Sequence, residues 1–230
     1  MSGSPSVTIQ RQPRLKRINL TVIKDQIIVK GPINMRDKEA QNILNQHHSW
    51  VQKQLKAYQD LQKKYPEPQF ITNATHFYLG NPYKLQFKPQ SPPSIWLDNQ
   101  TLIMAGYSEH NDNQGLQKAL NKWYQDQARD ILTDRVHIHA QKMNCQVNQI
   151  RIKSQKSRWG SCSSKKNINL NWRLIKAPLH IIDYVVIHEL CHLTHMHHQA
   201  AFWQLVQQYD PAYKSHIRWL KKYGVALKDS

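Results

Sequence analysis

The apolar residues change their spacing along the first half of the chain. Residues 16–31 alternate in part between apolar and polar, which predicts a β-hairpin. Over residues 40–61 the apolar positions recur on one stripe at helical spacing, which predicts a helix. Four short strand-like runs follow within residues 75–104, joined by turns that contain proline and asparagine. These patterns predict a hairpin, a helix and a small β region over residues 1–106.

Longer helical patterns dominate the second half. Residues 114–142 carry one apolar stripe, whereas residues 179–194 are apolar on almost every side, which is typical of a buried helix. Two strand-like segments lie between them, Gln149–Lys153 and Ile168–Leu174, and two short helices close the chain. Strands come first and helices dominate later, which is the order of an α+β protein. The second region, residues 107–230, is either a separate domain or one continuous unit with the first.

Length and composition are those of a globular protein. The 230 residues are 40% hydrophobic and include seven Trp and ten Tyr, which argues against wholesale disorder. No window approaches 18 consecutive apolar residues, and basic residues interrupt the first twenty, so we expect neither a membrane span nor a signal peptide. Three cysteines, without CxxC spacing, suit a reducing compartment. We therefore expect a cytoplasmic protein.

The chain is strongly basic. Its 32 Lys and Arg residues outnumber 15 Asp and Glu, and the resulting net charge of +17 attracts polyanions. Residues 151–176 hold eight Lys or Arg and no acid, with Trp159 and Trp172 among them. We expect the tryptophans to fill the core. The basic run is either a solvated face or a rim that contacts an acidic peptide, a nucleic-acid-bound protein or a nucleotide.

The clearest chemical signal is the segment His188-Glu189-Leu190-Cys191-His192. Two histidines four residues apart lie on one face of a helix, so both imidazoles can reach one ion. Glu189 projects about 100° around the helix and can hold a metal-bound water without ligating the metal. Buried His and Glu side chains need polar partners, and one metal ion satisfies all three at once. The segment therefore predicts a metal-dependent hydrolase.

A catalytic zinc site needs a third protein ligand and one open position. His195, His197 and His198 are the candidates, and His198 stands six residues after His192, which is the spacing of the HExxHxxGxxH proteases. The chain departs from that class, because His195 replaces the glycine and no methionine follows residue 196 to form a Met-turn. If His198 is the ligand, His195 and His197 are rim residues close to the substrate.

Four segments of the second half carry a specific pattern. They are Arg158–Cys162, Ile168–Leu174, Asp183–His192 and His198–Trp203. Together with the N-terminal hairpin and helix, they resemble the YgjP-like metallopeptidase family over most of the chain. That family is related to the SprT-like and WLM domains, which cleave proteins crosslinked to DNA or are associated with DNA repair.

The resemblance implies a fold, a metal and a ligand set. The fold is a zincin-like metallopeptidase core over residues 107–230, with antiparallel strands beside an active-site helix. The family pattern places the third ligand on the histidine that precedes a Phe-Trp pair by four residues, which here is His198. It also implies Zn²⁺ as the cofactor, Glu189 as the catalytic base, and a peptide or protein as the substrate.

Further residues near the motif have two possible roles each. Glu189 would take a proton from the zinc-bound water and pass it to the leaving amine. Tyr184, on the same helical face as His188, and Arg158 are candidates to contact the substrate and stabilise an oxyanion, although core packing or an ion pair would explain each equally well. Asp183 either hydrogen-bonds a ligand histidine or lies where its charge suits the helix N-terminus, and we favour the second.

Alternative functions use the same region. One is metal-dependent hydrolysis of a nucleoside triphosphate, motivated by the basic surface but without a Walker-type loop. Another is a binding module whose basic face docks DNA. A cysteine nucleophile is not favoured, because no orienting base accompanies Cys162 at readable spacing, and Cys191 is typical of a small buried hydrophobe.

Overall fold

The structure, a computed structural model, describes residues 5–89, 92–155 and 157–228. Its chain forms two compact units, Met1–Pro66 and Glu67–Ser230. This boundary lies earlier in the chain than the expected one after residue 106. The small β region therefore belongs to the second unit, with the helices, and not to the unit of the N-terminal hairpin. Within the described residues, no helix is long and apolar enough to cross a membrane.

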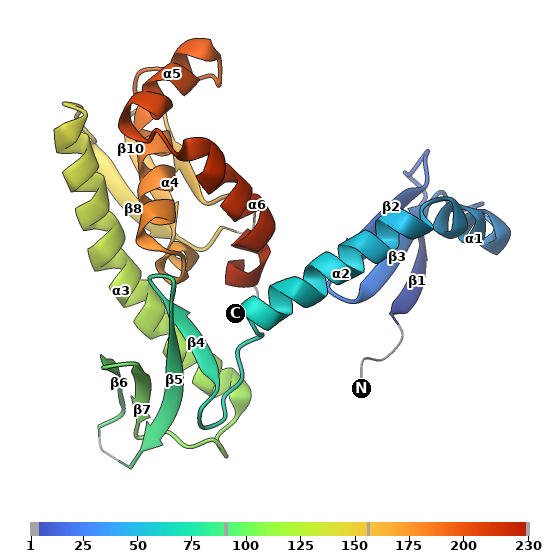
Figure 1. The fold of residues 1–230 in the computed structure, drawn as a ribbon, viewed down its shortest axis with the longest axis horizontal. Coiled ribbons are helices and arrows are strands. Elements are labelled where there is room, and N and C mark those ends of the chain that lie inside the picture. Colours follow the sequence, from blue (N-terminus) through green and yellow to red (C-terminus); the bar gives the residue numbers. More distant parts are fainter. Residues whose placement is uncertain (1–4, 90–91, 156, 229–230) are drawn as a thin grey trace. The chain divides into compact units, whose positions relative to one another are not determined.

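The first unit is built on a three-stranded sheet (Figure 1). Strands β2 (Asn19–Ile23) and β3 (Gln26–Gly31) form the predicted hairpin, with Lys24 at a φ of 58° in its turn. Strand β1 (Ser6–Arg11) pairs in parallel with β3, which gives the order β1-β3-β2. The sequence analysis missed β1, because its partner lies beyond another strand and no local turn signals the pairing.

Two helices complete the first unit where the sequence predicted one. They are α1 (Asp37–Gln46) and α2 (His48–Lys64), and the chain changes direction at His47. Val51 and Leu55 of α2 pack against β3 in a small core. The apolar stripe was interpreted correctly, but neither Gly nor Pro signals the end of the first helix at His47.

The second unit opens with a four-stranded sheet in the order β4-β5-β7-β6. Its strands confirm the four predicted runs: β4 (Thr75–Tyr78), β5 (Asn81–Lys88), β6 (Ser94–Asp98) and β7 (Thr101–Ala105). The pairs β4–β5 and β6–β7 are antiparallel, and β5 and β7 join them in parallel.

This sheet is fastened to the helices that follow it. The backbone N–H of Leu79 donates to the carbonyl of Ile175 at 2.7 Å, and the hydroxyl of Tyr124 donates to the carbonyl of Phe77 at 2.9 Å. These contacts explain why the compact unit includes a sheet that the sequence analysis placed in the first region. That residues 107–230 alone form the metallopeptidase domain stays a prediction.

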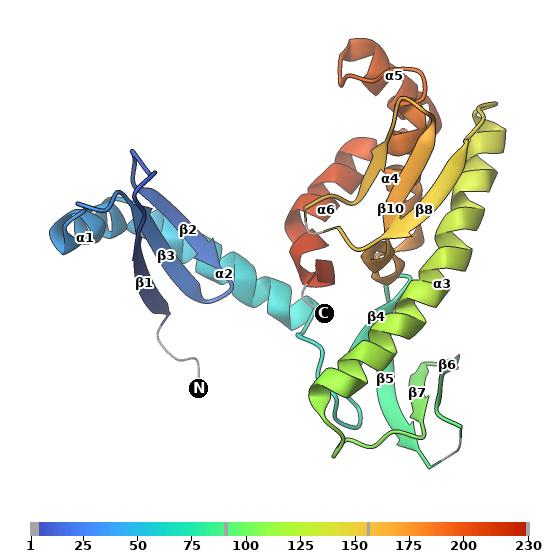
Figure 2. The ribbon, with the colours of Figure 1, turned by 180° about the vertical axis from the view of Figure 1, so that it is seen from behind.

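Two long helices lie side by side against a second sheet in this unit (Figures 1 and 2). The helices are α3 (Asn113–Lys142) and α4 (Leu179–Cys191), and the strands are β8 (Gln149–Lys153), β9 (Gly160–Cys162) and β10 (Asn167–Asn171). The order is β8-β10-β9, with β10 parallel to β8 and antiparallel to β9. The sheet is therefore mixed: the expected antiparallel pairing holds for β9 and β10, whereas β8 and β10 are parallel.

The parallel pairing of β8 and β10 was not predicted, and the reason is local. Strand β9 is three residues long and lies within the segment that the sequence analysis took as a polar connection. The predicted strand Ile168–Leu174 ends at Asn171 and continues as the 3-10 helix η1 (Trp172–Lys176). Helices α5 (Ala200–Tyr209) and α6 (Tyr213–Lys228) close the chain as predicted. The mixed α+β class is confirmed.

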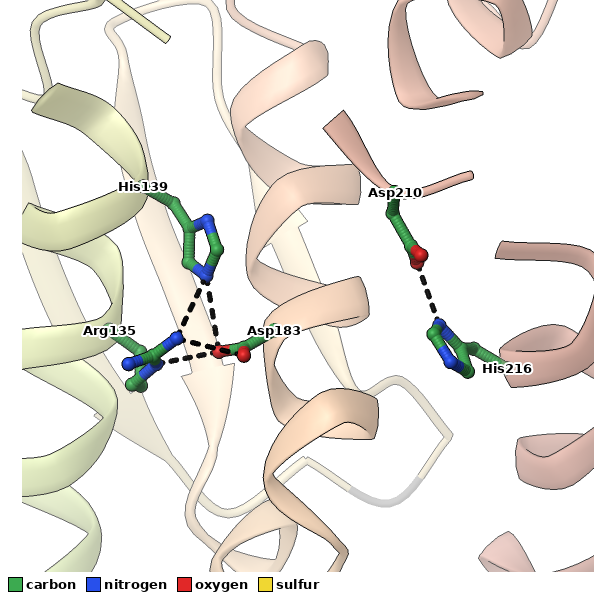
Figure 3. A network of polar contacts seen from close by, with 5 residues as sticks. All are labelled: Arg135, His139, Asp183, Asp210 and His216. Carbon is green, nitrogen blue, oxygen red and sulfur yellow. Dashed lines mark hydrogen bonds and ion pairs between the residues drawn. The ribbon is translucent and has the colours of Figure 1, made fainter. Parts of the chain in front are cut away.

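Polar contacts lie on both sides of α4 (Figure 3). Arg135 of α3 donates to the two carboxylate oxygens of Asp183 at 2.6 and 2.8 Å, and Nε2 of His139 lies 3.2 Å from the same carboxylate. On the other side, Nδ1 of His216 lies 2.7 Å from a carboxylate oxygen of Asp210, which joins the start of α6 to the end of α5. Helix α4 is thereby tied directly to α3.

The role of Asp183 differs from the one that the sequence analysis favoured. Burial alone would raise the pKa of Asp183, but the hydrogen bonds and positive charges of His139 and Arg135 hold that pKa below its ordinary value. Asp183 thus stays ionised and pairs across two helices. The interpretation as a charge placed for the helix N-terminus alone was wrong, because the pairing needs residues of α3 that lie far away in the sequence.

Candidate metal centre

The end of α4 and the loop after it carry the three histidines of the motif. His188 and Glu189 lie in the last turns of α4, and His192 follows the last helical residue with helical backbone angles. The N–H groups of residues 193–195 donate back to the carbonyls of Leu190 and Cys191, which closes the helix end. The chain then turns and brings His198, just before α5, back over the helix.

The side chains of His188, His192 and His198 converge on one point. Each offers a ring nitrogen, and these three atoms lie within 4.8 Å of one another. Nε2 of His188 and Nε2 of His198 are 3.1 Å apart. Two nitrogens bound tetrahedrally to zinc at 2.0–2.1 Å would be about 3.3 Å apart, so this spacing fits a shared ion.

The tautomer of His192 suits a metal ligand. Its Nδ1 lies 3.0 Å from the backbone carbonyl of His195, which can only accept a hydrogen bond, so Nδ1 carries the proton and Nε2 keeps a free lone pair. His195 therefore contributes its backbone to the site. The predicted contact of the His195 and His197 side chains with a substrate stays a prediction.

An aromatic side chain supports all three imidazoles. The ring of Phe202 is fully buried, and its centroid lies 5.0, 4.6 and 4.7 Å from those of His188, His192 and His198. Trp203 stacks on His198 at 5.6 Å. The sequence analysis used this pair only as a family marker. Phe202 and Trp203 stand four and five residues after His198, within the first turn of α5, and this spacing was the sequence signal for a support of the imidazoles.

The imidazoles of His188 and His192 are partly buried, and this setting favours their neutral form. Burial, and then the neighbouring His192 and His198, lower the pKa of His188 to about 3. Burial also lowers the pKa of His192. Neutral imidazole is the form that binds a metal ion. Nδ1 of His188 is buried and has no hydrogen-bond partner in the described part of the chain, so packing against Phe202 and Tyr184 holds this ring.

Glu189 lies in a tight, largely buried position beside β9. Burial raises the pKa of its carboxyl to about 8, and the positive charge of Arg158 opposes this. A Cβ atom on Gly160 would come within 2.6 Å of Oε1 of Glu189. Only glycine therefore lets β9 approach the carboxylate this closely. The sequence analysis quoted Gly160 within a family segment but assigned it no role.

Two predicted substrate contacts lie next to this carboxylate. Arg158, which is exposed, and Tyr184, which is buried, line a cavity of about 240 Å³ that is also bordered by His188 and Glu189. The ring centroids of Tyr184 and His188 are 5.9 Å apart. The structure thus brings both residues to the histidine cluster, and their contact with a substrate stays a prediction.

The basic run of residues 151–176 does not form one surface. Lys176 is buried among aromatic rings, and burial lowers its pKa to about 7. Arg173 lies over Trp172 at 4.5 Å, and Trp172 fills the core as expected. Lys156 lies outside the described residues. A contact of the exposed basic residues with nucleic acid or a nucleotide stays a prediction.

The two cysteines near the site keep their protons. Burial raises the pKa of Cys162 to about 11 and that of Cys191 to about 12. The thiolate is the nucleophilic form, so neither cysteine is poised to attack a substrate. Cys191 is fully buried, in agreement with its interpretation as a small hydrophobe.

Three converging imidazoles and a neighbouring carboxylate, carried by a mixed α+β fold, form the kind of site that metal-dependent hydrolases use. Comparison with known families is specific: the model described as YgjP-like, metallopeptidase domain matches residues 16–223. The chain therefore belongs to the YgjP-like metallopeptidase family, and the resemblance seen in the sequence is confirmed. Membership points to a metal ion, and to a peptide or protein substrate.

Other comparisons add little. No curated protein matches the chain. Among solved structures, the chain is similar to the crystal structure of the metallopeptidase zymogen of Pyrococcus abyssi abylysin, with 24% identity over 40% of this chain and 95% of that one. The TM-score is 0.37, so the two chains share too little backbone geometry for this likeness to define a common fold.

Proposed function

We propose that this protein is a zinc-dependent metallopeptidase with a zincin-like core. His188, His192 and His198 hold the ion, and Glu189 is the general base. The observation that carries this proposal is the approach of three imidazole nitrogens to within 4.8 Å of one another beside a buried carboxylate. Three imidazoles and an open fourth position suit a catalytic zinc ion.

The residues divide the chemistry between them. When bound, the ion would act as a Lewis acid and would lower the pKa of the water molecule bound to it towards neutrality. Glu189 accepts a proton from the attacking water on its carboxylate and then gives that proton to the nitrogen of the leaving amine.

The substrate backbone has a place to lie along β9. This strand is at the edge of its sheet and packs against α4. An extended peptide can add to such an edge through main-chain hydrogen bonds. Arg158 and Tyr184 then face the peptide from the cavity next to Glu189, and His195 and His197 face it from the loop between the second and third ligands.

The test separates metal binding from catalysis. We expect the purified protein to bind about one zinc per chain by elemental analysis and to cleave casein-like proteins. Glu189→Gln keeps the zinc but lowers cleavage by a factor on the order of 10²–10⁴, because the proton acceptor is lost. Asp134→Asn, the same kind of change at an exposed position of α3, is the control.

Two results would contradict the proposal. One is a folded protein that takes up no metal, and the other is a Glu189→Gln variant that cleaves as fast as the unchanged protein. The same assay with nucleoside triphosphates tests the alternative substrate. If nucleotides are hydrolysed and peptides are not, the metal site stands but the peptidase assignment is wrong.

A further inference from the structure

A cavity of about 240 Å³ lies beside the histidine cluster, wholly within the second unit. Three segments form its apolar walls. Trp159 precedes β9, Tyr184 and Val185 come from α4, and Leu220 comes from α6. His188 and Glu189 border the cavity on the side of the candidate metal centre. Whatever enters it therefore lies next to the candidate metal centre.

The wall that carries Trp159 is already fixed in position. The buried Asn171 donates from its side-chain amide to the carbonyls of Gln155 and Arg158, at 2.7 and 3.0 Å. Its backbone N–H donates to the carbonyl of Trp159 at 2.8 Å. A binding wall held by such hydrogen bonds needs little ordering when a ligand arrives.

A glycine on α6 sets how far the indole of Trp159 stands back from the cavity. A Cβ atom on Gly224 would lie 3.1 Å from Cζ2 and 3.4 Å from Nε1 of Trp159. Because Gly224 has no side chain, the indole packs directly against the helix. A larger residue there would displace the ring by a few tenths of an ångström and so alter the cavity wall that Trp159 forms.

Size and lining together define the occupant. An apolar protein cavity of about 150 Å³ binds benzene, so about 240 Å³ accommodates a phenyl ring or a branched aliphatic side chain. An alanine side chain would leave most of this volume unfilled. Burying the larger apolar group favours binding by a factor of roughly 10–100, on the usual value for burial of such a side chain.

The neighbouring carboxylate indicates which substrate residue enters. In the proposed mechanism Glu189 gives its proton to the leaving amine, so that nitrogen must lie close to Glu189. The cavity borders the same carboxylate. The side chain that enters it therefore belongs to the residue that contributes the amine.

We infer that this cavity, walled by Trp159, Tyr184, Val185 and Leu220, selects peptides with a large apolar side chain on the amine side of the cleaved bond. The inference rests on the proposed peptidase function. It assigns Leu220 and Gly224 to specificity, although both belong to a helix outside the HExxH motif.

The test uses the zinc-loaded full chain and quenched fluorescent peptides that differ only at this residue. We expect kcat/KM to be 10- to 100-fold higher with Phe or Leu than with Ala. Leu220→Trp fills the cavity and should lower kcat/KM for the Phe peptide by about tenfold or more, while the Ala peptide changes less than threefold. Val225→Trp, at an exposed position of the same helix, is the matched control.

A second variant protects the test against misfolding. Gly224→Ala displaces Trp159 and should change the ratio of kcat/KM for the Phe and Leu peptides, with zinc content and circular dichroism unchanged. Equal kcat/KM for the Phe, Leu and Ala peptides would overturn the inference while leaving the peptidase function in place.

A binding measurement separates the two ideas further. Hydroxamates chelate the ion without being cleaved, so we compare one that carries a benzyl group with one that carries a methyl group by calorimetry. We expect the benzyl compound to bind at least tenfold more tightly, and Leu220→Trp to abolish the difference. A protein that shows this preference but cleaves no peptide contradicts the proposed function alone, whereas equal binding of both compounds contradicts the cavity assignment.

Discussion

At the scale of single residues, the candidate metal centre combines a motif of α4 with side chains and a glycine from other elements. Helix geometry places His188 and His192 on one face of α4 and Glu189 about 100° around from it, so this arrangement was predictable. The contact of Gly160 with Glu189 was not, because it depends on how closely a strand approaches a helix that follows it later in the sequence. The same holds for Phe202 beneath the histidines.

The contact between Gly160 and Glu189 leads to a sharp prediction. Gly160→Ala places a methyl group against the carboxylate and displaces it from the attacking water. We expect kcat to fall by roughly 10- to 100-fold, since small misplacements of catalytic groups are costly, while zinc content stays near one per chain. Gly115→Ala, where a Cβ meets only an ordinary contact at 3.8 Å, should leave activity unchanged. Full activity of the Gly160→Ala variant would show that β9 yields at no cost.

At the scale of elements, long periodic segments were predictable and short paired ones were not. Helix α3 was predictable from apolar positions at helical spacing, and α4 from a long segment that is apolar on almost every side. Strand β9 is three residues long, and β1 pairs in parallel with a strand beyond its neighbour, so neither leaves a local pattern. The ion pair of Asp183 with Arg135 is likewise a contact between distant segments.

The ion pair between α3 and α4 predicts a pH-dependent contribution to stability. Because the pKa of Asp183 is lowered in the folded protein, its stabilisation is complete above the ordinary aspartate value of about 3.9 and is lost as the pH falls through the folded value. Asp183→Asn should lower the free energy of unfolding by about 1–3 kcal/mol at pH 7, and by progressively less as the pH falls below about 3.9.

Urea unfolding of the metal-free protein and of the Asp183→Asn variant, between pH 3 and 7, measures this difference. Asp134→Asn on α3 serves again as the control for loss of one carboxylate. A difference between Asp183→Asn and the unchanged protein that is constant over the whole range would contradict the assigned ion pair.

At the scale of the whole molecule, the boundary between units depends on contacts that composition does not reveal. The β4–β7 sheet joins the second unit through η1, where the N–H of Gly80 donates to the carbonyl of Lys176. The side chain of Lys176 is buried, 4.8 Å from the centroid of Tyr124 and 5.3 Å from that of Trp172. From the sequence, this lysine was expected either on a solvated face or on a basic rim near the substrate, whereas the fold places it in the core.

The buried lysine predicts how the stability of this unit varies with pH. Its pKa of about 7 lies below the unfolded value of about 10.4, so the folded state releases the proton first and stability rises between these two values. The rise from this group is at most about 1.4 kcal/mol per pH unit. Lys176→Met removes this rise. In urea titrations, the unfolding free energy of the unchanged protein should therefore increase steadily relative to that of the variant from pH 7 to pH 10. A constant difference would mean that Lys176 stays charged in the core.

Whether three imidazoles share one ion is measured most directly by X-ray absorption at the zinc edge. We predict that only nitrogen and oxygen coordinate the zinc, with three imidazoles at about 2.0–2.1 Å, and that His198→Ala loses one of these imidazoles. Sulfur at about 2.3 Å from the zinc, or an unchanged imidazole count in His198→Ala, would contradict this prediction.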